Sequence, residues 1–162
     1  MKNTLSRILK CMDLEFDCHT LKKGTTVFSL QCEMQSATFN YVLLLRELHS
    51  PSVLQFSLQV PVTIPTDKMA EMMLFVTAMN QHQQDEPGHW VLDTATGNLT
   101  VVYNWYFSAD DEHFDNIFRH LFVKLIADTD DSIGSIYSVL KGVLHPEVAA
   151  AHYINRNKAW LN

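Results

Sequence analysis

Hydrophobic and polar residues alternate along much of the first half of the chain, which is the pattern of β-strands that bury one face. Residues 25–34 and 52–60 alternate cleanly. Residues 38–47 continue the alternation, but Val42 and Leu44 make the second face apolar as well, so this stretch is either a central strand or a helix. Several antiparallel strands are therefore predicted in this half.

The limits of this strand region are set by weaker signals. Residues 14–21 are a short and ambiguous strand candidate. Pro61 and Pro65 lack a backbone N–H for a sheet ladder, so the last strand of the region is predicted to end at residue 60.

Apolar residues recur at helical spacing elsewhere in the chain. Residues 3–14 are predicted to form a helix with Asn3 or Thr4 as its N-cap. A second helix is predicted from residue 66 or 67 to Asn80, with methionines along its apolar stripe. Three more helices follow in the prediction: one after the acidic residues Asp110, Asp111 and Glu112, one capped by Thr129 and ended by Gly142, and one from Pro146.

A β-hairpin is predicted between the second and third helices. Residues 89–93 and 99–107 are its strands, and Gly97 in the connection can adopt the left-handed conformation. Asp93 is expected to bond the backbone of its own turn, with a catalytic carboxylate as the alternative. The order of these elements predicts an α+β fold in which helices flank an antiparallel sheet. At 162 residues and 47% hydrophobic content, residues 1–162 are predicted to form a single domain.

Four segments resemble the YbjN-like family, labelled as bacterial sensory transduction regulators, whose fold is similar to that of type III secretion chaperones. These segments are VLQFSLQVPVTIP, MLFVTAMNQ, GHWVLDTATGNLTVVYNWYF and DTDDSIGSIYSVLKGVLHPEVAAA, and together they lie between residues 50 and 151. The chain departs from the family at Tyr103-Asn104-Trp105, where the usual pattern contains an arginine. The resemblance implies a type III secretion chaperone-like fold and a regulatory or chaperone-like role. It is carried by structural residues: Asn80, Gly88, Asp93, Gly97 and Gly142.

The sequence contains no recognisable motif for catalysis, for metal binding or for a phosphate. Cys11, Cys18 and Cys32 form no CxxC pair and are predicted to be reduced and mostly buried. His113 and His120 are two helical turns apart, about 10 Å, which is too far for one metal ion. We therefore expect no enzyme activity, no metal and no cofactor. The polar loop from His82 to His89 is either a simple connector or a ligand site.

A protein partner is the function that the surface pattern favours. The second hairpin strand carries apolar side chains on both faces, and a single layer of helices can cover only one of them. Val102 and Tyr106 are predicted on the second face, which a second copy of the chain or the helix from Pro146 would cover. Met69, Met72 and Met73 are candidates for the core, a dimer contact or a partner surface.

Charge and hydropathy exclude some classes of binding partner. The net charge is −6 and no long basic run occurs, so no nucleic acid is expected. Charges interrupt the N-terminal region, no stretch is long enough to span a membrane, and a cytoplasmic location is expected. The leading interpretation is a non-enzymatic protein-binding adaptor that forms a homodimer. The alternative is a domain that senses a small molecule.

Overall fold

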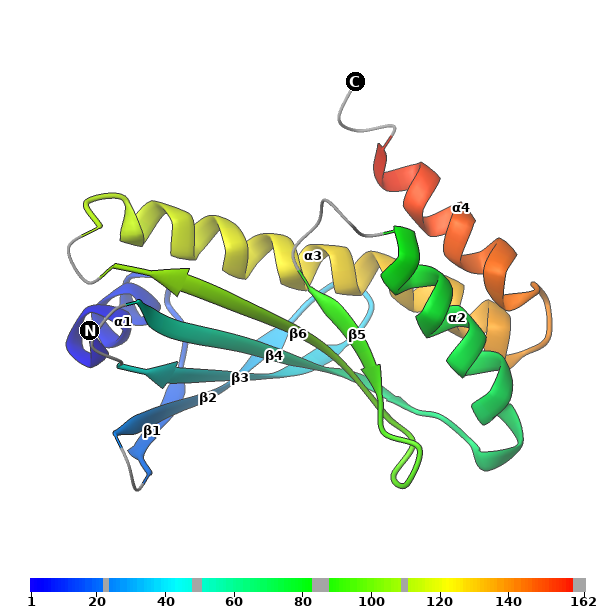
Figure 1. Ribbon diagram of the computed structural model, residues 1–162, viewed down its shortest axis with the longest axis horizontal. Helices are drawn as coiled ribbons and strands as arrows, with labels where there is room; N and C mark the ends of the chain where they lie inside the picture. Colours follow the sequence, from blue (N-terminus) through cyan, green and yellow to red (C-terminus); the bar gives the residue numbers. More distant parts are fainter. Residues whose placement is uncertain (22–23, 48–50, 83–87, 109–110, 159–162) are drawn as a thin grey trace.

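In the part of the chain that the structure describes, six strands pair into one antiparallel sheet with the order β1-β2-β3-β4-β6-β5 (Figure 1). This computed structural model describes residues 1–21, 24–47, 51–82, 88–108 and 111–158. The strands are β1 (Phe16–Thr20), β2 (Thr25–Glu33), β3 (Thr38–Arg46), β4 (Ser52–Thr63), β5 (His89–Leu92) and β6 (Asn98–Phe107). The predicted α+β class is confirmed.

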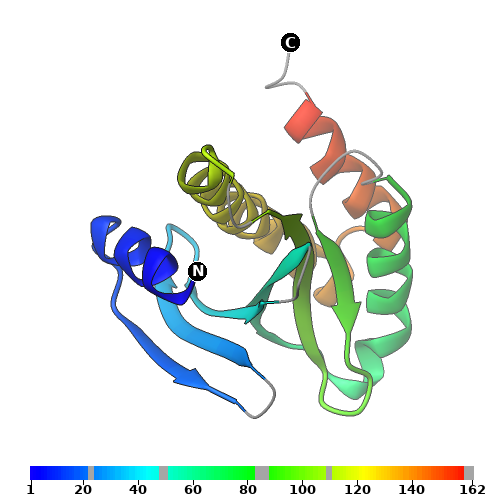
Figure 2. The same ribbon diagram turned by 60° about the vertical axis from the view of Figure 1, so that its left-hand side comes forward.

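The helices lie on one side of this sheet. They are α1 (Lys2–Cys11), the 3₁₀ turn η1 (Thr66–Lys68), α2 (Met69–His82), α3 (Phe114–Leu140) and α4 (Pro146–Lys158). Helix α3 runs along the middle of the sheet, α1 lies at the β1 end, and α2 and α4 lie together at the β5 end (Figures 1 and 2).

Aromatic side chains join the sheet to α3. Phe56 of β4 stacks on Phe118 with ring centroids 5.8 Å apart, and Trp105 of β6 stacks on Phe114 at 4.8 Å. Phe118 is fully buried. The predicted contact between the odd-numbered face of the second hairpin strand and the phenylalanine stripe of the helix is confirmed.

The residues from 114 to 140 form one helix, so the predicted break at Thr129 is wrong. The Thr129 hydroxyl donates a hydrogen bond to the Leu125 carbonyl within the helix instead of capping a new one. Lys124 and Asp128 form an ion pair one turn apart, just before the predicted boundary. Ile133 and Ile136 are buried and continue the apolar stripe, and this burial outweighs the local polar signal.

Strand β4 continues to Thr63, past the predicted end at residue 60. Pairing with β3 stops at Gln59, and the register with β6 shifts between Gln59 and Thr63. Pro61 therefore lies where the ladder is interrupted, and its missing N–H costs no strand hydrogen bond.

The first helix begins earlier and ends earlier than predicted. Asn3 and Thr4 lie inside it, and the N-cap position is taken by Met1 without a side-chain hydrogen bond. The amino group of Met1 instead lies 3.1 Å from a carboxylate oxygen of Glu47.

The hairpin turn is built by Asp93 and Gly97. The Asp93 carboxylate accepts hydrogen bonds from the Ala95 N–H and the Thr96 hydroxyl, at 2.9 and 2.7 Å. Gly97 has a φ of 74°, and a Cβ there would collide with the Ile64 carbonyl. Only glycine therefore fits this turn.

Candidate protein-binding face

The face of the sheet opposite the helices carries no covering element among the described residues (Figure 2). Alternate residues of each strand point to this side, and the antiparallel register aligns them in cross-strand rows. We define the open face as the residues that β2, β3, β4 and β6 place there: Thr25, Val27, Ser29, Gln31, Glu33, Thr38, Asn40, Val42, Leu44, Arg46, Val53, Gln55, Ser57, Gln59, Thr100, Val102, Asn104 and Tyr106.

Charge is absent from the middle of the open face. Arg46 at the end of β3 and Glu33 at the end of β2 are the charged residues of this described set. The edge strands add Asp17 and His19 from β1, and His89 and Val91 from β5. The middle of the face therefore consists of amides, hydroxyls and small aliphatic side chains.

Tyr106 is the most prominent side chain of the open face. It is 63% exposed and stands in the same row as Val53 and Arg46. Val102 lies on the same strand in another row, between Ser57 of β4 and His89 of β5. The structure thus brings the two predicted surface residues of β6 onto one uncovered face.

The three candidate methionines differ in their exposure to solvent. Met72 is fully buried against the sheet, so its prediction as a partner surface is wrong. Helical geometry turns its neighbour Met73 outward, where it is 51% exposed, while Met69 is partly buried. None of the three belongs to the open face, because α2 packs on the opposite side near β5.

The residues of the predicted structural signature lie at chain reversals. Asn80 forms two hydrogen bonds with the backbone of Trp90, and Gly88 precedes β5 with a φ of 115°. Gly142 follows the end of α3 with a φ of 67°, as a glycine after a helix does. These residues shape the fold, and none of them belongs to the open face.

The other polar candidates do not gather into a site. Most of the His82–His89 loop and Asp110 lie outside the described residues, and His89 itself is exposed on β5. His113 and His120 are exposed on the surface at α3. No group of three or more metal-ligating side chains occurs within the described ranges.

The cysteines differ in exposure, which corrects the expectation that they are mostly buried. Cys11 is exposed because it lies on the outer side of α1, Cys18 is intermediate, and only Cys32 is buried. Burial raises the pKa of the Cys32 thiol to about 11, so this thiol stays neutral.

Sequence reasoning did not place Val42, Leu44 and Val53 at the candidate site. All three lie on the open face and are partly buried by their neighbours. The signal was present in residues 38–47, because an apolar residue on both sides of a strand indicates that both faces are covered.

The comparisons with known proteins do not assign this chain to a family. A scan of the sequence against models of protein families found no match, and a search among curated proteins found none either. No helix in the described residues has the length and apolar character needed to cross a bilayer.

Proposed function

We propose that this protein is a non-enzymatic, cytoplasmic protein-binding adaptor that acts as a homodimer, and that the open face holds the second copy. The observation that carries the proposal is a sheet face that is uncovered among the described residues, uncharged in its middle and marked by one exposed aromatic residue, Tyr106. The resemblance to YbjN-like proteins supports a regulatory or chaperone-like role for the dimer.

Charge distribution supports a second copy on this face. Two chains of net charge −6 repel each other, so they associate best through a surface that contributes little to that charge. Charge depletion and an exposed tyrosine are also typical of the centres of protein interfaces.

The dimensions of the face fit a small dimer interface. Strands spaced about 4.8 Å apart, with about 3.3 Å per residue, make a six-stranded face from Thr25 to Gln31 roughly 600 Å² in area. Stable interfaces bury about 800 Å² on each partner, and the projecting side chain of Tyr106 adds to the planar estimate.

The intramolecular alternative does not apply. The helix from Pro146, α4, packs against α2 and α3 on the helix-covered side of the sheet. The described part of the chain thus leaves the open face available.

Site-specific photo-cross-linking tests the proposal. A photoreactive phenylalanine derivative replaces Tyr106 in one variant and Tyr137, which is 44% exposed on α3, in a matched control. The proposal expects a covalent dimer from position 106 and none from position 137. Equal yields from the two positions, or no dimer from either, would contradict it.

The adaptor role is tested by partner capture. We expect a pull-down with the wild-type protein to recover one protein in stoichiometric amount. A small molecule that co-purifies, with no protein recovered, would favour the alternative function of ligand sensing.

A further inference from the structure

The two charged residues of the open face lie at its opposite ends. Arg46 is the last residue of β3 and pairs with Thr25 at the start of β2. Glu33 is the last residue of β2 and pairs with Thr38 at the start of β3. At about 3.3 Å per residue, the rows of Arg46 and Glu33 are about 26 Å apart. One end of this face is therefore positive and the other end is negative.

Both charges are available to another molecule. Arg46 and Glu33 are exposed, and neither forms an ion pair within the described residues. The carboxylate next to Arg46 in the sequence, Glu47, is paired with the amino group of Met1. A charge on the rim of an interface is favourable where the partner presents the opposite charge. A second copy of the chain presents both signs.

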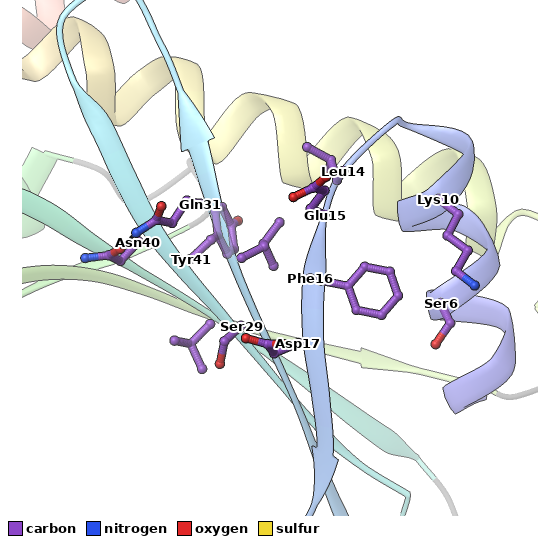
Figure 3. Close-up of a pocket in the computed structure, with 12 residues that line it drawn as sticks. Ser6, Lys10, Leu14, Glu15, Phe16, Asp17, Ser29, Gln31, Asn40 and Tyr41 are labelled. Atoms are coloured by element: carbon purple, nitrogen blue, oxygen red, sulfur yellow. Dashed lines mark hydrogen bonds between the residues drawn. The ribbon is translucent and has the colours of Figure 1, made fainter.

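The row midway between the two charges consists of small side chains. Its members on the four strands of the open face are Ser29, Val42, Ser57 and Val102. One row nearer to Glu33, the Gln31 amide donates a hydrogen bond to the Asn40 side-chain oxygen on the neighbouring strand at 3.2 Å (Figure 3). Small side chains in the central row let a second sheet approach to the usual distance of about 10 Å.

Two copies related by a two-fold axis can align their sheets in two ways. If the axis runs along the strands, equal ends meet, so the two Arg46 ends lie together and each Glu33 is about 26 Å away. If the axis runs across the strands along the central row, opposite ends meet, and each Arg46 lies over the end that carries Glu33 in the other copy. Since like charges that face each other across an interface are unfavourable, the second arrangement is favoured.

The twist of the sheets brings the opposite charges closer together. Twisted sheets that pack face to face cross at about −30°. At the row of Arg46 this rotation displaces one sheet relative to the other by about 7 Å, which is between one and two strand spacings. Seen from the open face, β2 and β1 lie on one side of β3, and a rotation of this sign moves Arg46 toward that side of the second copy (Figure 3). Arg46 thus moves from above Thr38 of the second copy toward its Glu33.

The charges of the edge strand β1 are compatible with this arrangement. Asp17 pairs with Ser29 and so lies at the end of the central row, and His19 is one row closer to Arg46. The same rotation brings His19 of the second copy closer to Asp17 than the second Asp17 comes. An imidazole can donate a hydrogen bond to a carboxylate in either protonation state.

We propose that two copies stack their open faces with the strands antiparallel, and that Arg46 of each copy forms an ion pair with Glu33 of the other. This inference rests on the proposed function, in which the open face is the dimer interface. The two-fold axis follows the central row, so the dimer contains two such ion pairs and pairs every charge of the open face. The ion pairs select a second copy as the occupant and determine its orientation.

Exchange of the two charges tests this geometry. Arg46→Glu and Glu33→Arg each place like charges at both contacts of a homodimer, and each should weaken the dimer about a hundredfold or more. An equimolar mixture of the two variants should recover a dimer that contains one copy of each. In this heterodimer one contact keeps the native residues, and the other contact is the same pair reversed.

Matched controls separate the contact from the change in net charge. Lys141→Glu and Glu112→Arg change the net charge by the same amounts at exposed positions outside the sheet. Each control should remain dimeric alone, and their mixture should combine copies at random. Sedimentation equilibrium measures the oligomeric state, native mass spectrometry measures the composition of the dimer, and thermal melts verify that every variant is folded. The double variant Arg46→Glu/Glu33→Arg should again form a homodimer.

Each outcome supports or overturns the geometry. Monomeric single variants whose mixture forms the heterodimer support it. Single variants that remain as dimeric as the wild type, or monomeric variants whose mixture stays monomeric, overturn the proposed ion pairs and leave the open-face dimer to be judged by cross-linking from position 106. A wild-type protein that is itself monomeric overturns both this inference and the proposed function.

Discussion

Asn80, near the end of α2, binds the backbone of Trp90 in β5 through both atoms of its side-chain amide. The Asn80 amide nitrogen donates to the Trp90 carbonyl at 2.9 Å, and the Trp90 N–H donates to the Asn80 oxygen at 2.8 Å. Strand β5 is at the edge of the sheet, so these outward backbone groups have no neighbouring strand. Asn80 therefore satisfies the outward backbone groups of Trp90 and links α2 to the hairpin.

Replacing this amide should destabilise the protein without changing its fold. Asn80→Ala leaves a donor and an acceptor of Trp90 unpaired, which should lower the free energy of unfolding by about 2–3 kcal/mol. Gln81→Ala, at an exposed neighbouring position, should change it by less than about 0.5 kcal/mol. Urea denaturation of the two variants measures the difference, and equal midpoints would show that the two hydrogen bonds contribute nothing net.

The aromatic contact between α3 and the sheet should be the most sensitive part of the core. Phe118 is fully buried between Phe56, Phe114 and Phe122. Phe118→Ala should therefore cost about 3–5 kcal/mol. The adjacent Ile117 is 36% exposed, so Ile117→Ala should cost much less. A Phe118→Ala protein that melts within a degree or two of the wild type would refute this packing.

The hairpin turn should make stability depend on acid pH. Hydrogen bonds from the Thr96 side chain, and then from the Ala95 N–H, hold the pKa of Asp93 below its ordinary value. A lowered folded-state pKa stabilises the protein above the ordinary aspartate pKa of about 3.9, and this contribution is lost as the pH falls through the lowered value.

Asp93→Ala should accordingly melt below the wild type at pH 7, and the gap should narrow as the pH is lowered below about 4. Thr94→Ala, in the same exposed turn, serves as the control and should show a gap that does not vary with pH. Thermal melts across this range check the prediction, and a gap for Asp93→Ala that widens in acid would contradict it.

The cysteines should react in the order of their exposure. The thiolate is the reactive form, so the buried Cys32, with its pKa raised to about 11, should resist alkylation at pH 8 until the protein unfolds. Cys11 is exposed and should react first. Mass spectrometry of the alkylated native protein measures this order, and Cys11→Ser should remove the fast phase. Rapid labelling of Cys32 in the native protein would mean that β2 is not covered.

Local periodicity was sufficient to predict most elements. The strict alternation around Phe28 and Phe56 and the helical spacing of Phe114 and Phe118 reflect burial on one face, which requires no knowledge of the neighbours. Thr129 misled the prediction because threonine followed by acids is also a common helix start. Only the packing of Ile133 on the same side as Leu125 shows that the helix continues.

The sites depend on long-range arrangement and were harder to foresee. Tyr106 and Val102 could be assigned to the second face of their strand, but the rest of the open face required the register of β3 and β4. Met72 and Met73 are neighbours with the same chemistry, and the direction of the core decides which one is buried.

Sedimentation equilibrium of the purified protein at tens of micromolar tests the central claim most directly. The proposal expects a species of twice the 18.6 kDa chain mass, and it expects Tyr106→Glu, which places a negative charge on the open face, to shift the protein toward the monomer. Tyr137→Glu on α3 should leave the dimer intact. A wild-type protein that sediments as a clean monomer, or a Tyr106→Glu variant that remains fully dimeric, would contradict the assignment of the open face.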